Sequence, residues 1–276
     1  MNPYPSFPDV EDASSRLFEH GHLWIQEAID GIPLRVQLER SGLLRFGDET
    51  RVYDPGEEPL AVGHAVRHVR DRLDREALRE AVDDVEGVTF YGWATSKRTI
   101  EYDWDRIPSF LGVDVHSSAS DGLLPPDVVE GIFRKLGLEP VNAVAKEIRA
   151  QDFDPQGYEI PDSNWYDGPA AGVLVRNKTG GRARIFTVDS GVCDEEPGGA
   201  ADPEDLAERY ATDARLEGIA RKLEDDAVDF DVLYQRALEQ LARTEPELRF
   251  DEGEEAAFRL FRSTVARRVQ AVIDRQ

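Results

Sequence analysis

The stretch LWIQEAIDGIPLRVQL, Leu23–Leu38, decides how the fold is interpreted. In its second half, Leu34–Leu38, apolar and polar side chains alternate, which is the period-2 pattern of a strand with one solvated face. Asp30 and Gly31 separate this strand from an earlier apolar segment, and an Asp-Gly pair in that position is a strong signal of a hairpin turn. The stretch therefore predicts two strands joined by a tight turn.

Segments suited to strands alternate with helical segments from about residue 20 to residue 190, which indicates an α+β domain. Further strands are predicted at Leu43–Phe46, Val88–Tyr91, Phe110–Val115, Gly172–Arg176 and Ala183–Thr187. Apolar residues at helical spacing predict a helix over 62–73, a second helix that begins after Asp74, and a third over 124–137.

The character of the chain changes after an acidic, glycine-bearing stretch that begins at Cys193. From near Asp202 onward, apolar residues repeat at intervals of three and four, which predicts an all-helical appendage of three or four helices. We therefore expect two domains, at residues 1–195 and 200–276.

The composition is strongly acidic, with 56 acidic and 33 basic residues and a formal net charge of −23. Such a charge ordinarily repels nucleic acid, because affinity for the phosphate backbone comes largely from lysine and arginine. Only five of the basic residues are lysine. Acidic, lysine-poor chains resemble halophilic proteins, which work in molar salt with a Debye length of about 3 Å. The acidity is therefore explained by a saline environment and says little about the partner.

Cellular location follows from what the sequence lacks. Cys193 is the only cysteine, which excludes an internal disulfide and a cysteine-based zinc site and agrees with a reducing compartment. No stretch approaches the roughly 20 apolar residues of a membrane helix, and the first residues do not form a secretion signal. We expect a cytoplasmic protein without a membrane partner.

Four stretches carry residues suited to chemistry on phosphates. They are QEAIDG at 26–31, LRFGDETRVY around Arg51, FYGWATSKRTIEYDWDRIPSFLGVDV at 90–115 and YDGPAAGVLVRNKTGGRARIF at 166–186. In this order and at these spacings they resemble the ATP-dependent RNA ligase family of the covalent nucleotidyltransferase superfamily, and haloarchaeal-type proteins with an RNA ligase domain in particular. The resemblance covers about residues 20–187.

The resemblance implies an adenylation domain with mixed or antiparallel sheets, like that of RNA ligases and broadly like ATP-grasp folds, with ATP and Mg or Mn bound between the sheets. It also implies three steps: a lysine captures AMP, AMP passes to an RNA 5′-phosphate, and a 3′-hydroxyl displaces it. A lysine amine attacks the α-phosphorus only when it is deprotonated and held in line, while a metal and cationic side chains disperse the developing charge.

The sequence departs from the family pattern at each of these functions. Ala28 stands where the nucleophilic lysine is expected, Trp93 where an acidic residue would hold the ribose, and Ala171 where a metal-associated glutamate is usual. Arg182 and Arg184 stand where the last strand usually carries lysine. No residue is therefore assigned as catalytic or metal-binding, and the protein is expected to be a pseudoenzyme in the adenylation step.

Other features of the pattern are retained and predict a preserved binding site. The predicted nucleotide-binding residues are Glu27, Asp30, Gly31, Arg51, Trp93, Asp114, Arg176, Lys178, Arg182 and Arg184. Trp93 is equally suited to fill a vacated nucleotide site as a core aromatic. Lys97 and Lys178 lie beside the degenerate motifs, so either is a candidate for a displaced nucleophile.

Three functions from different classes follow from the sequence. The leading hypothesis is a ligase-like protein that cannot self-adenylate but binds a nucleotide or RNA ends, or regulates an active ligase partner. The second is a working RNA ligase, either ATP-dependent through a displaced lysine or active on pre-adenylated RNA ends. The third is a purely structural interaction protein whose site is filled by its own side chains.

Overall fold

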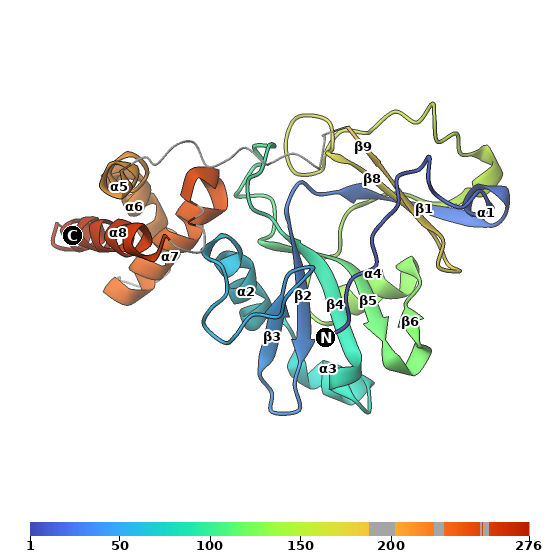
Figure 1. Ribbon diagram of the computed structural model, residues 1–276, viewed down its shortest axis with the longest axis horizontal. Helices are drawn as coiled ribbons and strands as arrows, with labels where there is room; N and C mark the ends of the chain where they lie inside the picture. The colour runs from blue at the N-terminus through green and yellow to red at the C-terminus, as the bar shows by residue number, and fades with distance from the viewer. Residues whose placement is uncertain (188–201, 224–228, 249, 251–253, 276) are drawn as a thin grey trace. The chain divides into compact units, whose positions relative to one another are not determined.

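The structure is a computed structural model that describes residues 1–187, 202–223, 229–248, 250 and 254–275 (Figure 1). Cys193 and the acidic stretch after it lie outside the described residues. The chain divides into two compact units: Met1–Glu58 with Ala65–Gly191, and Pro59–His64 with Val192–Gln276.

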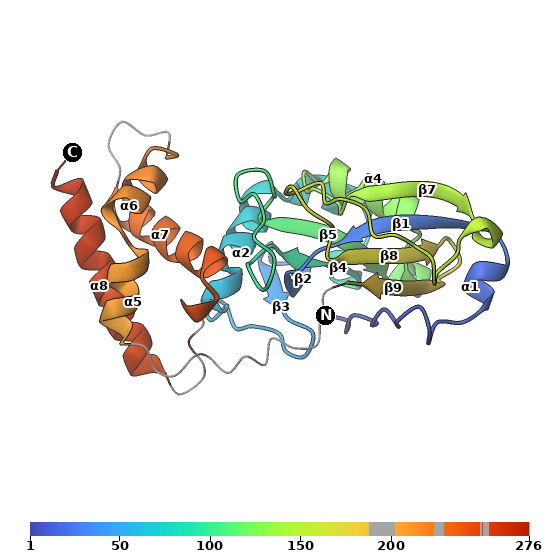
Figure 2. The ribbon, with the colours of Figure 1, turned by 90° about the horizontal axis from the view of Figure 1, so that it is seen from above.

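The first unit is built on two sheets whose neighbouring strands are all antiparallel. The four-stranded sheet has the order β7 (Ala143–Arg149), β1 (His22–Ala28), β8 (Gly172–Asn177) and β9 (Arg182–Phe186), as Figure 2 shows. The five-stranded sheet has the order β3 (Leu44–Gly47), β2 (Ile32–Leu38), β4 (Val88–Ala94), β5 (Phe110–Ser117) and β6 (Gly122–Leu123). The α+β prediction is confirmed.

The predicted hairpin at Asp30 and Gly31 is wrong. β1 pairs with β7 and β8, whereas β2 pairs with β3 and β4, so the turn carries the chain from one sheet to the other. A Cβ on Gly31 would lie 2.6 Å from the carbonyl oxygen of Ala94, so glycine is required here for the close approach of β4. The local signal was read correctly as a turn, but long-range pairing decided which strands it joins.

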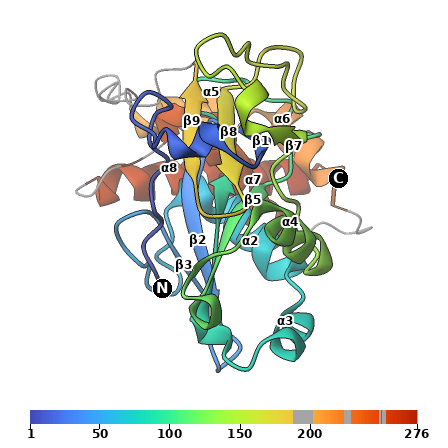
Figure 3. The same cartoon turned by 90° about the vertical axis from the view of Figure 1, so that its right-hand side faces the viewer.

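The helices of the first unit are short. They are α1 (Arg16–Glu19), α2 (Leu60–Arg72), which belongs to this unit from Ala65 onward, α3 (Arg75–Ala81) and α4 (Pro126–Lys135), with 3₁₀ turns at Val85–Gly87, Ser118–Ser120 and Ala150–Asp152. Asp74 is the predicted N-cap, since its side chain accepts a hydrogen bond from the amide of Ala77 at 2.9 Å. α3 and α4 lie on one side of the five-stranded sheet, and the segment that precedes α1 runs along its other side (Figure 3).

The second unit contains the predicted helical appendage. Its helices are α5 (Pro203–Tyr210), α6 (Asp213–Ala220), α7 (Phe230–Thr244) and α8 (Glu255–Ile273), with a 3₁₀ turn at Pro246–Leu248. Asp202, Thr212 and Asp229 cap the first three of them. Leu233, Phe261 and similar apolar residues at helical spacing form its buried core. No helix in the described ranges is long and apolar enough to cross a membrane.

Close packing between β5 and α4 gives a testable prediction. A Cβ at Gly112 would lie 2.3 Å from the ring of Phe133, whereas a Cβ at Gly131 of α4 meets nothing within 4 Å. We expect Gly112→Ala to lower the free energy of unfolding by about 1–3 kcal/mol through overpacking. The matched control Gly131→Ala should be neutral or raise it by up to about 1 kcal/mol, because alanine favours helix. Urea unfolding of both variants measures this, and equal stabilities would contradict the packing described.

Candidate functional site

Ala28 ends β1 and is fully buried. Its methyl group belongs to an apolar cluster to which both sheets contribute, since Leu111 and Val113 come from β5 and Leu174 from β8. Phe7, from the segment before α1, is a further buried member. A methyl group cannot form a phosphoramide, and the position is enclosed by apolar side chains. The chain therefore has no nucleophile here.

Aromatic side chains add to the same cluster. Trp93 of β4 packs against it together with Trp104, Trp165 and Tyr166. The Tyr102 ring is buried in the cluster and meets Tyr166 edge to face at 5.6 Å between ring centroids. Trp93 therefore packs as a partly buried aromatic against the cluster that contains Ala28.

Asp30 holds a neighbouring loop. Its buried carboxylate accepts hydrogen bonds from the amide and hydroxyl of Thr99, at 2.7 and 2.6 Å, and from the amide of Ile100 at 3.0 Å. The amide of Asp30 donates to the hydroxyl of Tyr102 at 2.9 Å. These bonds fix the turn between the sheets and leave the carboxylate engaged within the chain.

Glu27 is buried beside a different loop. Its carboxylate accepts from the hydroxyl of Ser163 at 2.6 Å, the amide of Asn164 at 3.2 Å and the side chain of Asn142 at 3.3 Å. Burial raises the pKa of Glu27, and the hydrogen bonds from these three partners oppose that shift. Side chains alternate along a strand, so Glu27 points to the opposite face of β1 from Ala28.

Asp114 joins the two sheets. It is fully buried on β5 and accepts hydrogen bonds from the guanidinium groups of Arg176 on β8 and Arg182 on β9. Arg176 also donates to the side chain of Gln26 at 3.1 Å and to the carbonyl of Val113 at 2.9 Å. These three predicted residues are brought together as one buried ionic cluster with a net charge of +1.

The other predicted cations lie apart from this cluster. Lys178, after β8, pairs with Asp127 at 3.1 Å and Glu147 at 2.7 Å. Arg184 pairs with Asp9 at 2.7 Å. Arg51 lies in the loop after β3, where it is about half exposed and pairs with Asp48 at 3.5 Å.

Of the two candidates for a displaced nucleophile, Lys178 is far along the chain from position 28. Ala28 pairs with Gly172 at the start of β8, and Lys178 is six residues further along, which is about 20 Å at the rise of a strand. Hydrogen bonds to Glu147 and Asp127 raise the pKa of Lys178, which favours the unreactive ammonium. Lys97 forms an ion pair with Glu101.

Sequence reasoning missed the residues that complete the ionic cluster. The hydroxyl of Tyr4 donates to Asp114 at 2.7 Å, and its ring stacks on Tyr91 with centroids 4.5 Å apart and planes at 19°. Burial, with the Asp114 carboxylate beside it, raises the pKa of Tyr4 well above its usual value, so the phenol remains a donor. Arg35 of β2 is also buried here. The sequence feature that marks this segment is the presence of three prolines and two aromatic residues within residues 3–8.

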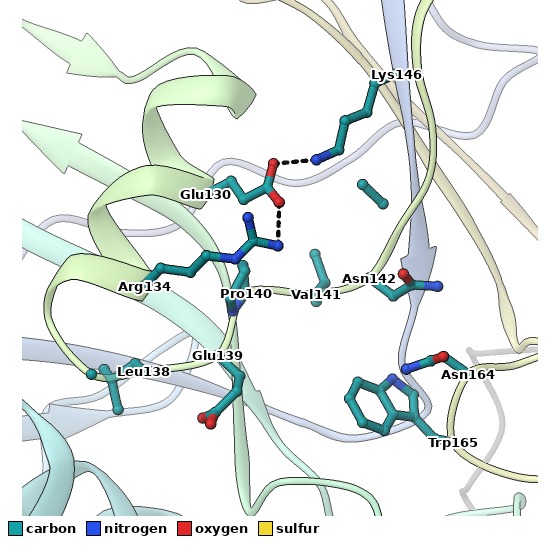
Figure 4. A pocket seen from close by; sticks show the side chains of 12 residues that line it. Glu130, Arg134, Leu138, Glu139, Pro140, Val141, Asn142, Lys146, Asn164 and Trp165 are labelled. Atoms are coloured by element: carbon teal, nitrogen blue, oxygen red, sulfur yellow. Dashed lines mark hydrogen bonds and ion pairs between the residues drawn. The ribbon is translucent and has the colours of Figure 1, made fainter.

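A cavity of about 430 Å³ lies between α4 and the segment that leads into β7 (Figure 4). Glu130 bridges Lys146 at 2.6 Å and Arg134 at 2.5 Å on one wall, and Trp165 lies with two asparagine side chains on another. Glu139 is a further lining residue, so the charges of the lining cancel. None of the predicted nucleotide-binding residues lines this cavity.

The position predicted to lack its metal ligand offers no side-chain oxygen or nitrogen. Ala171 is buried, and its carbonyl oxygen accepts from the amide and hydroxyl of Thr187 at 3.0 and 3.1 Å. The described residues contain no group of three or more His, Cys, Asp or Glu side chains suited to a metal ion. The residues present thus do not fit a resident Mg or Mn ion of their own.

The ionic cluster supports a prediction about stability. Asp114→Asn leaves Arg176 buried without its anionic partner, and removing one member of a buried ion pair costs about 3–5 kcal/mol. Asp9→Asn makes the same charge change at the more exposed pair with Arg184, where the expected cost is under about 1 kcal/mol. Chemical unfolding of both variants in the same salt measures the difference. Equal losses would contradict a buried bridge between the sheets.

Comparisons with known proteins agree with this architecture. No family model matches the sequence, and no curated protein is detectably similar to it. Among solved structures, Naegleria gruberi RNA ligase with PPi is similar with a TM-score of 0.52 and 11% identity, covering 67% of this chain and 56% of that one. An archaeal ATP-dependent RNA ligase matches 99% of this chain and 66% of its own, with a TM-score of 0.47 and 12% identity. A putative ATP-dependent DNA ligase from Aquifex aeolicus has a TM-score of 0.45 and 13% identity, covering 100% of this chain and 66% of its own.

The chain thus spans less than two thirds of the length of these ligases. At 11% identity, the similarity to the Naegleria enzyme establishes the fold and leaves activity open. The first unit has an RNA-ligase-like nucleotidyltransferase fold.

Proposed function

We propose that this protein is an RNA-ligase-like protein that does not adenylate itself and instead binds a nucleotide or a 5′-phosphorylated RNA end without covalent chemistry, as a partner or regulator of an active ligase. The observation that supports the absence of self-adenylation is the burial of Ala28 in an apolar cluster to which both sheets contribute. ATP finds no amine at that position, and the methyl group there is fully buried.

The proposed binding of a nucleotide or RNA end rests on the arginines between the sheets. Arg176 and Arg182 share one buried carboxylate, Asp114, and Arg35 is buried on β2 of the same sheet as Asp114. Guanidinium groups suit phosphate because their planar fork donates two parallel hydrogen bonds. They also stack on aromatic rings. In a chain with a net charge of −23, a local excess of arginine is the feature best suited to an anionic ligand.

ATP with Mg or Mn enters this proposal only as a ligand to be tested. The similar Naegleria ligase is known with ATP and Mn in a point mutant, and that statement concerns that protein alone. Ala171 offers no side-chain ligand to a metal, which favours a ligand that needs no metal held at this position.

A working ligase with a displaced lysine is the less favoured function, because Lys178 lies about 20 Å along β8 from the position paired with Ala28. The purely structural reading has one observation in its favour. Aromatic residues, Trp93 among them, pack against the apolar cluster that contains Ala28.

Intact mass spectrometry after incubation with ATP and Mg or Mn tests the adenylation half. We expect no AMP adduct on the natural protein, and none on Ala28→Lys, because the apolar cluster closes the space around that position. Ala28→Met is the matched control, since it adds similar length without an amine and reports how far the cluster tolerates a longer side chain.

An adduct on the natural protein would overturn the proposal. An adduct on Ala28→Lys alone would contradict the closed space and would indicate an ATP pocket that lacks only its amine.

A further inference from the structure

Residues 2–9, which we call the covering segment, lie against both sheets of the first unit. The side chain of Asn2 lies 3.0 Å from the ring nitrogens of His116 on β5, and the amide of Val10, just after the segment, donates to the carbonyl of Arg184 on β9 at 3.0 Å. Between these ends, Phe7 is buried in the apolar cluster with Ala28. The segment therefore covers the face on which the ionic cluster lies.

The backbone of the covering segment offers mainly acceptors, since three of its eight residues are proline and lack an N–H. Arg35 donates to the carbonyl of Asn2 at 3.2 Å. Arg182 donates to the carbonyl of Pro5 at 2.9 Å, and the amide of Arg184 to that of Pro8 at 2.9 Å. The arginines thus meet a row of carbonyl oxygens where phosphate oxygens would satisfy the same donors.

The aromatic rings of the covering segment make the contacts that the base of a nucleotide would make. Tyr4 stacks flat on Tyr91, as a base stacks on an aromatic side chain. The guanidinium of Arg182 lies over the ring of Tyr4 at 5.3 Å and over that of Phe7 at 3.9 Å. A stacked ring with oxygen acceptors directed at arginines is the arrangement that a nucleotide end would make on this face.

The covering segment is held by few buried groups. Asn2, Pro3, Pro5 and Ser6 are exposed, and Phe7 is its only fully buried side chain. Ordering a residue costs about 1–2 kcal/mol of backbone entropy, whereas a typical hydrogen bond returns about 0.5–1.5 kcal/mol. Residues 2–5 can be displaced while Phe7 stays buried in the cluster with Ala28, because Tyr4 is the one residue among the four that packs against that cluster.

We propose that the covering segment competes with a 5′-phosphorylated nucleotide end for the face formed by Arg35, Tyr91, Arg176 and Arg182, so that ligand binds only when residues 2–5 are displaced. This inference rests on the proposed function and adds its regulation. Displacement leaves Arg35 and Arg182 without the carbonyl acceptors of the segment and exposes the ring of Tyr91 for stacking.

The test compares binding of a short 5′-phosphorylated RNA, labelled at its 3′ end, by fluorescence anisotropy. Replacing residues 2–5 by Gly-Ser-Gly-Ser frees the face and retains Phe7 in the core. A binding-competent state populated at 10% or less lowers apparent affinity at least tenfold, so we expect the replacement to tighten binding by about tenfold or more. Tyr4→Ala, a milder change, should give part of this gain.

Two controls locate the effect. In the replaced background, Arg182→Gln should abolish the gain, whereas Arg45→Gln, with the same charge change at an exposed pair with Glu39, should leave it. The same RNA with a 5′-hydroxyl should gain little. A thermal melt of each variant confirms that it is folded.

The outcomes separate the inference from the function on which it rests. Equal binding by the natural and replaced proteins would overturn the competition but leave end binding intact. Weaker binding after replacement would overturn it as well, because the segment would then be part of the site. An equal gain for the 5′-hydroxyl RNA would overturn the phosphate end as the ligand. Binding by none of the variants would overturn the proposed end binding itself.

Discussion

The buried carboxylate of Asp114 holds the two sheets of the first unit together. It is fully enclosed on β5, and it accepts from two guanidinium groups that come from β8 and β9 of the other sheet. A single charge cannot neutralise two, so further acceptors are needed: Gln26 and the carbonyl of Val113 serve Arg176. For Arg182 the acceptor comes from the covering segment, which ties that segment to the cluster. The need to satisfy the two buried arginines thus joins the two sheets and holds the covering segment over them.

The alanine at position 28 and the apolar packing around it belong together. A lysine at position 28 would place an ammonium among Leu111, Leu174 and Phe7, where burial strongly disfavours charge. With alanine there, the same surroundings become a core that both sheets and the covering segment share. The fold that the first unit shares with RNA ligases is then stabilised by apolar packing around position 28.

Much of the fold was predictable from local patterns, and the arrangement of the site was not. The strands around Leu34, Phe90 and Leu174 and the cap at Asp74 follow from alternation and capping chemistry, which act within a few residues. Alternation from Phe110 would place Asp114 on the face that packs on α4. An irregularity in the β4–β5 pairing, after Tyr91, turns it to the opposite face instead.

The role of residues 2–9 depends on contacts with residues 35, 91, 114 and 182, so no local pattern could reveal it. The same holds for the turn at Asp30, whose two strands enter different sheets.

The central claim is that the face between the sheets is occupied by the protein's own covering segment. Nuclear Overhauser effects between ring protons, in protein labelled at its eight tyrosines and without ligand, test it most directly. With ring centroids 4.5 Å apart, Tyr4 and Tyr91 should give strong cross-peaks that vanish in a Tyr4→Ala sample used for assignment. Tyr4 signals at the positions of an unfolded peptide, with no cross-peak to Tyr91, would contradict the account.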